Sequence, residues 1–231
     1  MQKSAAATQT GTDVRVRHLG PSSFSTIHQQ MLELQRELGS PAVAATAQCR
    51  DTLILFEPSP VITLGSSASS CDVLAENSFL QEQGIEIVKV DRGGEATYHG
   101  PGQLLAYPVF TLGAQQRDLH SLLRCLENAV IETLDHWGIE GQRDPDHTGV
   151  WVAKHKIASI GLSVRRWVTG HGLSLSISGD LSPFQWIIPC GIQDCPVTSM
   201  EKELGSPPDS RQVETILTQQ ILNQFGRTIP R

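Results

Sequence analysis

The sequence lacks the segments that mark several large classes of protein. No apolar run approaches the roughly 18 residues needed to span a bilayer, so we expect no membrane partner. Residues 1–13 hold one lysine, no arginine and no apolar stretch, unlike a signal or transit peptide. No stripe of basic residues interleaves with aromatics, and the net charge is −6, so we expect no nucleic-acid partner.

Cysteine is scarce and odd in number. The cysteines are Cys49, Cys71, Cys125, Cys190 and Cys195. Five thiols do not form a disulfide framework, which favours a reducing compartment, and we predict a cytoplasmic location. Cys190 and Cys195 lie five positions apart, but no second close-spaced Cys or His pair completes a zinc site, so we expect no metal.

The composition is that of a globular protein. The chain has 231 residues, of which 39% are hydrophobic and 18% charged, enough for one domain of generous size. We expect residues 14–231 to form a single catalytic domain and the polar residues 1–13 to be a disordered lead-in. No internal repeat or interdomain linker is present.

Apolar periodicity predicts alternating strands and helices, and therefore an α+β fold built on a mixed β-sheet flanked by helices. Two strands at 52–56 and 61–64 are expected to pair, and 85–90 reads as a buried strand. A capping box of Thr198 and Glu201 predicts the start of a short helix. Further strands are expected at 14–19, 104–110, 149–152, 157–164, 167–177 and 187–188, and helices at 24–38, 72–83, 118–137 and about 213–225.

The stretch between 91 and 103, DRGGEATYHGPGQ, organises the rest of the chain. It holds four glycines, an arginine, two hydroxyls and a histidine between two predicted strands. Glycine lets a backbone approach a ligand closely, and loops at strand ends commonly carry binding sites. A long hairpin connection is the alternative interpretation of this composition.

Three further motifs accompany this loop in a fixed order. They are HKIASIG at 155–161, HGLSL at 171–175, and IIPCGI at 187–192 followed by VTSM at 197–200. Together the four motifs resemble the lipoyl(octanoyl) transferases, from about Leu53 to Met200. The resemblance implies the fold of the biotin and lipoate protein ligases.

The resemblance also implies a cysteine and a lysine that act together. Cys190 would be the nucleophile, since a thiolate attacks thioesters readily, although an arbitrary cysteine is more often structural. Lys156 precedes Ile-Ala-x-x-Gly as in the family, and apolar neighbours would favour its neutral, proton-accepting form. Lys154 is expected to be a solvated strand-edge residue.

The expected substrate-binding residues come from three of the motifs. His99 could donate a hydrogen bond or relay a proton, whereas His171 is expected to be an ordinary cross-strand histidine. Backbone amides beside Cys190 or in the Gly93–Gly94 loop could stabilise an oxyanion. The full set is Arg92, Gly93, Gly94, Glu95, Ala96, Thr97, Tyr98, His99, Ser159, Ile160, Gly161, Gly172, Leu173 and Ser174.

The implied reaction is transfer of octanoyl from octanoyl-acyl carrier protein, through a Cys190 thioester, to a lysine of a lipoyl domain. The implied acceptors are the lipoyl domains of 2-oxoacid dehydrogenase complexes and the glycine cleavage H protein. Exchange between thioesters needs no nucleotide, and the chain has no P-loop, so we expect no cofactor. Alternatives are an ATP-dependent lipoate or biotin-type ligase and a non-catalytic lipoyl-domain binder.

Because acyl carrier proteins and lipoyl domains are typically acidic, the resemblance requires a local basic patch on this acidic chain. Arg165 and Arg166, between two predicted strands, are candidates for that patch, with Arg92 nearer the site. Charged hairpin tips are more often simply solvated.

Overall fold

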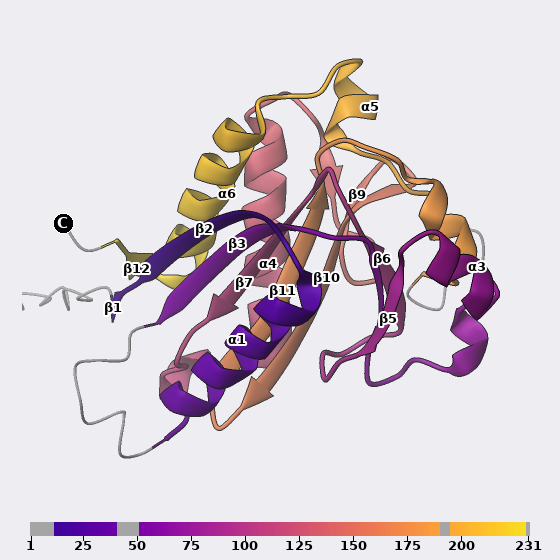
Figure 1. The fold of residues 1–231 in the computed structure, drawn as a ribbon. Coiled ribbons are helices and arrows are strands. Elements are labelled where there is room, and N and C mark those ends of the chain that lie inside the picture. The colour runs from indigo at the N-terminus through magenta and orange to yellow at the C-terminus, as the bar shows by residue number, and fades with distance from the viewer. Residues whose placement is uncertain (1–11, 41–50, 190–194, 230–231) are drawn as a thin grey trace, which may run out of the picture.

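The computed structural model describes residues 12–40, 51–189 and 195–229 (Figure 1). Within them, a mixed sheet of seven strands forms the centre of the molecule, with β2 parallel to β3 and the other neighbours antiparallel. Its order is β2 (Arg15–Ser22), β3 (Thr52–Pro58), β7 (Gln103–Val109), β11 (Val168–Ser176), β10 (His155–Arg165), β9 (Val150–Val152) and β8 (Gly141–Gln142). The predicted α+β class is confirmed.

A smaller sheet lies beside the main one and corrects two predictions. Its order is β5 (Glu86–Lys89), β4 (Val61–Leu64), β6 (Ala96–His99). The expected pairing of 52–56 with 61–64 is wrong, because the two prolines at 58 and 60 carry the chain from one sheet to the other. The expected burial of 85–90 is correct only at its ends, Ile85 and Val90, because the edge strand β5 between them is largely exposed, with Ile87 39% exposed.

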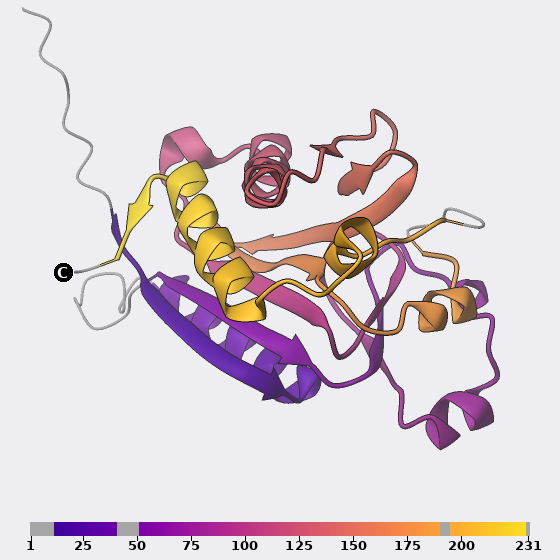
Figure 2. The ribbon, with the colours of Figure 1, turned by 90° about the horizontal axis from the view of Figure 1, so that it is seen from above.

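Helices cover both faces of the main sheet (Figure 2). The helices α4 (Leu119–Asp135) and α6 (Ser210–Phe225) pack on one face, and α1 (Phe24–Leu38) packs on the other. Side chains of Ser23, Asp118 and Asp209 accept backbone N–H bonds at the three helix starts, as N-caps do. The apolar stripes predicted for these helices therefore face two separate layers of core.

The hairpin of β10 and β11 supplies much of the cavity described below. Its turn is formed by Arg166 and Trp167, both at positive φ. Within β10, Ile157 is an extra residue opposite β9, where Lys156 pairs with Trp151 and Ala158 pairs with Val150. This bulge reverses the alternation of side chains, so Lys156 leaves the core face that Ile157 and Ala158 share.

The short elements differ from the sequence predictions at their ends. The helix expected at 72–83 is a 3-10 turn η1 (Ser70–Asp72) and a helix α3 (Asn77–Glu82), and Ile187 makes a single bridge to Val73 in place of a strand. The N-cap of α5 (Met200–Leu204) is Ser199 rather than Thr198, whose hydroxyl instead binds Glu203. The remaining elements are β1 (Thr12–Asp13), paired with β12 (Arg227–Thr228), and the 3-10 turns η2 (Ala114–Gln116) and η3 (Ser182–Trp186).

Among the described helices, none has the combination of length and apolar character that crossing a bilayer demands. Residues 1–11, which make up most of the expected lead-in, lie outside the described residues. The last two residues of that segment, at 12 and 13, form β1.

Candidate active site

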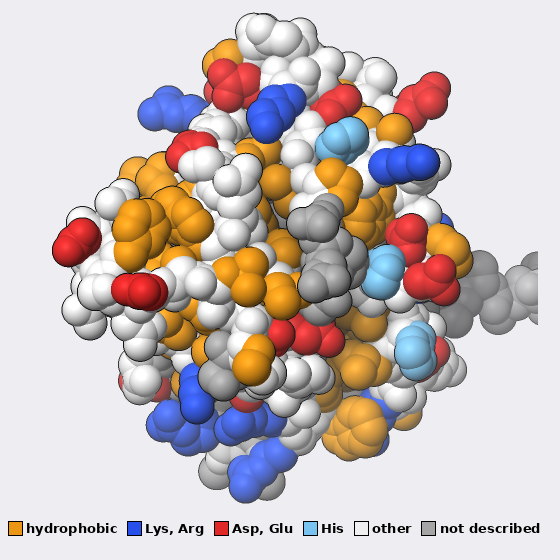
Figure 3. Space-filling model, turned by 90° about the vertical axis from the view of Figure 1, so that its right-hand side faces the viewer, with side chains coloured by type: hydrophobic (Ala, Val, Ile, Leu, Met, Phe, Trp, Pro, Cys, Tyr) orange, Lys and Arg blue, Asp and Glu red, His pale blue; other side chains and the backbone are white. Residues whose placement is uncertain are grey.

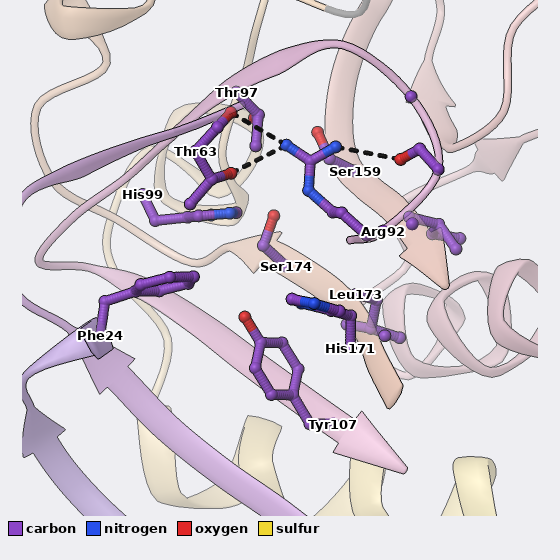
Figure 4. A pocket seen from close by; sticks show the side chains of 15 residues that line it. Phe24, Thr63, Arg92, Thr97, His99, Tyr107, Ser159, His171, Leu173 and Ser174 are labelled. Carbon is purple, nitrogen blue, oxygen red and sulfur yellow. Dashed lines mark hydrogen bonds between the residues drawn. The ribbon is translucent and has the colours of Figure 1, made fainter. Parts of the chain in front are cut away.

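A cavity opens between the main sheet and the smaller sheet, on the face that α1 covers (Figure 4). Its empty volume is about 470 Å³, including the space at its open mouth. The β10–β11 hairpin, β6, β4, β7, α1 and the glycine loop each contribute to its wall. The lining residues are Phe24, Thr63, Arg92, Gly93, Gly94, Thr97, His99, Tyr107, Ser159, Ile160, Gly161, His171, Gly172, Leu173 and Ser174.

Strand alternation decides which residues of the glycine-rich stretch reach the cavity. Thr97 and His99 line it, whereas Ala96 and Tyr98 point to the opposite side of β6 and belong to a separate hydrophobic cluster. Glu95 lies outside this cavity and lines a neighbouring one. Of the residues predicted to bind substrate, Glu95, Ala96 and Tyr98 are therefore not brought to this wall, and the others are.

Arg92 holds the glycine loop against the smaller sheet. Its Nη2 donates to the backbone oxygen of Thr63 at 3.1 Å and to Thr63 Oγ1 at 2.8 Å, and its Nη1 donates to Gly93 O at 3.0 Å (Figure 4). The Gly93 amide donates to Leu162 O at 3.0 Å. This amide is thus already bonded and does not offer the oxyanion contact expected from the sequence.

Asp91 ties the start of the loop to both strands of the hairpin. Its Oδ1 lies 2.9 Å from His171 Nε2, and its Oδ2 lies 2.9 Å from Arg165 Nε. The hydrogen bond from His171 lowers the pKa of Asp91 to about 2, and burial lowers the pKa of His171 despite the nearby carboxylate. A neutral His171 therefore carries its proton on Nε2 and presents an unprotonated Nδ1.

His99 is neutral for the same main reason. Burial, followed by the nearby Arg92 guanidinium, lowers its pKa to about 3. Gln103 donates to Tyr98 O, so its own oxygen faces His99 Nδ1 at 3.2 Å and accepts that proton. The ring consequently keeps an unprotonated Nε2, which can accept a hydrogen bond.

Lys156 lies on β10 but outside the lining of the cavity. Its side chain is 4% exposed, and Nζ lies 5.4 Å from the centre of the Trp151 ring. The backbone N–H of Lys156 donates to Pro196 O at 2.8 Å, and its backbone oxygen accepts from Thr198 N at 2.9 Å. The segment that follows the Pro-Cys-Gly motif therefore runs directly alongside this lysine.

Cys190 lies outside the described residues, so its distance from Lys156 is not part of the structure. The residues on either side are described. Pro189 bridges to Ala96 at the start of β6, and Val197 bridges to Lys156. Cys195 is buried and distinct from the predicted nucleophile.

One group of side chains among the described residues has the composition of a metal site. The ligand atoms of His28, Asp91 and His171 lie within 4.8 Å of one another. The Asp91 carboxylate is bonded to His171 and paired with Arg165, whereas the buried His28 Nε2 has no hydrogen-bond partner among the described residues. Burial and His171 lower the pKa of His28 to about 4, so this ring is also neutral near pH 7.

Sequence reasoning missed four lining residues: Phe24, Thr63, Tyr107 and His171. Phe24 was predicted as core, and its ring stacks on His99 with centroids 6.0 Å apart. His171 is 1% exposed with φ of 57°, a conformation unusual outside glycine. A histidine directly before a glycine in the HGLSL motif was the available signal, but its contact with Asp91 could not be read from the sequence.

The lipoyl protein ligase A/B catalytic domain family matches residues 29–222. Octanoyltransferases from Geobacter metallireducens and Solibacter usitatus are 42% and 45% identical, covering 83% and 80% of this chain and 84% and 81% of theirs. An octanoyltransferase from Chloroflexus aurantiacus is 44% identical, covering 91% of this chain and 93% of its own.

Solved structures share the fold at low identity. A lipoate-protein ligase A with bound ATP has a TM-score of 0.73 at 14% identity, covering 95% of this chain and 88% of its own. A protein from T. acidophilum with bound lipoic acid has a TM-score of 0.72 at 14% identity, covering 94% and 88%. The predicted ligase-type fold is thereby confirmed.

Proposed function

We propose, on the premise that this chain belongs to the lipoyl protein ligase A/B catalytic domain family and within it to the octanoyltransferases, that it transfers octanoyl from acyl carrier protein to lipoyl domains. The donor would be the octanoyl thioester of the carrier. The acceptor would be a lysine of a lipoyl domain in a 2-oxoacid dehydrogenase complex or in the glycine cleavage H protein. No nucleotide takes part in the proposed reaction.

The observation that carries this proposal is the convergence of three distant segments on one cavity. The glycine loop from Arg92 to Gly94, the β10 residues 159–161 and the β11 residues 172–174 form its wall. Beside it, the chain before residue 190 bridges to β6 and the chain after residue 194 bridges to Lys156. These contacts on either side of residue 190 support the proposal that Cys190 acts beside Lys156.

The chemistry assigned to the dyad balances in two steps. In the first, the Cys190 thiolate attacks the carrier thioester, a new carbon–sulfur bond forms, and the carrier thiol leaves with a proton that Lys156 delivers. In the second, the acceptor amine attacks the Cys190 thioester, an amide bond forms, and Cys190 leaves as a thiolate. Lys156 takes the proton that the amine loses.

The wall of the cavity suits an acyl chain bordered by polar groups. Gly161 and Gly172 carry no side chain, which lets Arg92 and the backbone of β7 pack closely against the hairpin. Leu173 and Ile160 supply apolar surface. Tyr107 and Ser174 present hydroxyl groups toward the same space (Figure 4). Burial raises the pKa of Tyr107, so its hydroxyl stays protonated and can donate a hydrogen bond.

A transfer assay with separate donors tests the proposal. The protein is incubated with an unmodified lipoyl domain and either octanoyl-acyl carrier protein without ATP, an octanoylated lipoyl domain without ATP, or free octanoate with ATP. The mass of the acceptor is then measured. Modification from octanoyl-acyl carrier protein alone is expected.

The other outcomes identify the alternatives. Modification that requires free octanoate and ATP would indicate a ligase. Transfer only from the octanoylated domain would indicate an enzyme acting between carrier domains. Binding of the lipoyl domain without modification in any arm would contradict an acyltransferase altogether.

A further inference from the structure

A buried carboxylate on α4 lies behind the backbone that packs against Lys156. The Glu127 side chain is 1% exposed, and its Oε1 accepts the backbone N–H of Gly149 at 3.2 Å. Its Oε2 binds Arg124 Nη1 at 2.6 Å and Arg143 Nε at 2.9 Å. A buried carboxylate is costly unless it is paired, so all three contacts are needed to keep Glu127 in this position.

Gly149 contacts Lys156 directly. A Cβ at position 149 would lie 2.6 Å from Lys156 Cε and 2.7 Å from Ala158 O, and the φ of 134° is one that other residues rarely adopt. Two residues later, Trp151 pairs with Lys156 across β9 and β10, and its ring lies near Nζ. The Gly149 backbone and the Trp151 ring therefore form two walls around the lysine side chain.

We propose that Glu127 is a positioning residue for Lys156. By accepting the Gly149 amide, and being held in turn by Arg124 and Arg143, Glu127 fixes the wall against which the lysine stem packs. A lysine amine sits at the end of a flexible four-carbon chain, so it keeps a fixed position only where the surrounding residues hold that chain. This inference rests on the proposed role of Lys156 in the transfer reaction.

The fold offers a matched control for Glu127. Asp51 is also a buried carboxylate; it accepts the backbone N–H of Thr111 at 2.8 Å and lies 3.0 Å from Arg227. Arg227 belongs to β12, at the opposite end of the molecule from β9 (Figure 1). Replacing either acid by its amide removes one buried charge with the same kinds of partner.

The experiment compares Glu127→Gln with Asp51→Asn in the full chain. The rate of acyl-enzyme formation is measured by rapid mixing and intact mass between pH 6 and pH 9, beside the melting temperature of each variant. Both variants are expected to have a lower melting temperature than the wild-type protein. Only Glu127→Gln is expected to slow acylation by about tenfold or more, because misplacement of a catalytic group by an ångström can cost about 10²-fold.

The pH profile separates positioning from simple destabilisation. If the lysine ammonium moves away from the thiol, the thiolate loses a favourable charge, so the midpoint of the acylation profile should move to higher pH. A variant that is only less stable loses active protein without moving that midpoint. Equal acylation rates and midpoints for Glu127→Gln and Asp51→Asn would overturn the positioning role.

A second variant acts on the same wall without touching Glu127. Gly149→Ala is expected to displace the Lys156 side chain and, like Glu127→Gln, to move the midpoint of the acylation profile to higher pH. Its control is Gly205→Ala, at a position that also has a positive φ, of 78°, and no atom within 4 Å of the added Cβ. If the variant Lys156→Met is acylated at the wild-type rate, the proposed dyad itself is wrong, and this inference fails with it.

Discussion

At the scale of single residues, the cavity is a place where histidines are kept neutral. His28, His99 and His171 all have lowered pKa values, for which burial is the largest cause. Neutral rings can accept hydrogen bonds within the cavity, whereas three imidazolium groups beside Arg92 would repel one another. The same feature makes the stability of the protein sensitive to acid.

The folded state of His99 binds its proton only near pH 3, whereas an unfolded histidine binds one near pH 6.5. Between these values the unfolded chain holds more protons, so this residue's contribution to stability is lost as pH falls through the window. At pH 5 the loss from His99 is about 2 kcal/mol. Chemical denaturation at pH 7 and at pH 5 gives the two unfolding free energies whose difference contains this loss.

The variant His99→Asn should reduce the difference in unfolding free energy between pH 7 and pH 5. The exposed His120, on the outer side of α4, provides the control, and His120→Asn should keep the wild-type difference. An unchanged difference in His99→Asn would mean that this histidine is not held neutral by the fold.

Residue identity alone predicted much of the site, and backbone geometry explains the remainder. Gly93, Gly94, Gly161 and Gly172 were predicted from motifs and line the cavity. The loop interpretation of 91–103 could not separate Thr97 from Tyr98, because the side on which each lies depends on residues 96–99 forming a strand. His171 was underestimated because its partner Asp91 is 80 positions earlier in the chain.

At the scale of elements, the β10–β11 hairpin controls the shape of the cavity. Ser174 lines the cavity, whereas Ser176, on the same face of β11, does not. The bulge at Ile157, which sequence periodicity did not reveal, turns Lys156 away from the core. One strand therefore presents both the cavity wall and the lysine.

Narrowing the cavity at β11 should change the preferred acyl chain. Ser174→Val adds bulk to the wall, so kcat/KM with an octanoyl donor should fall about tenfold relative to a butanoyl donor, the size of effect that one or two methylenes have in a pocket. Ser176→Val should retain the wild-type ratio. If Ser174→Val also retains it, the acyl chain does not occupy this cavity.

The errors in element prediction share a physical origin. The strands at 52–58 and 61–64 are each apolar, and only the tertiary structure shows that the intervening prolines send them to different sheets. The apolar residues of β5 suggested burial, although an edge strand has a neighbouring strand on one side only, which leaves it more exposed. The starts of α1 and α4 were predicted to within one residue, whereas the capping box at Thr198 was one residue early and the helix expected from 72 begins at Asn77.

At the scale of the whole molecule, an acidic protein must bind a carrier that is expected to be acidic. Figure 3 shows Lys and Arg side chains gathered at the lower edge of one face, the height at which Figure 1 places the β10–β11 turn. A groove at this turn is lined by Leu32, Gln35, Arg36, Arg165 and Arg166. Arg165 is partly engaged by Asp91, so Arg36 and Arg166 are the better test of carrier docking.

Reversing both charges, as Arg36→Glu with Arg166→Glu, should raise the KM for acyl carrier protein several-fold and leave kcat nearly unchanged. The effect should diminish at high salt, because surface charges are screened. Arg15→Glu with Arg211→Glu, two exposed reversals on β2 and α6, changes the net charge by the same amount and is the control. Equal KM values for the double variant and the control would exclude this patch as the docking surface.

The central claim is that octanoyl passes through a thioester on Cys190, and intact mass after incubation with octanoyl-acyl carrier protein tests it most directly. Wild-type protein and Cys195→Ala should each gain one octanoyl group, which hydroxylamine removes, and Cys190→Ala should gain none. Transfer to a lipoyl domain by Cys190→Ala at the wild-type rate would contradict the account.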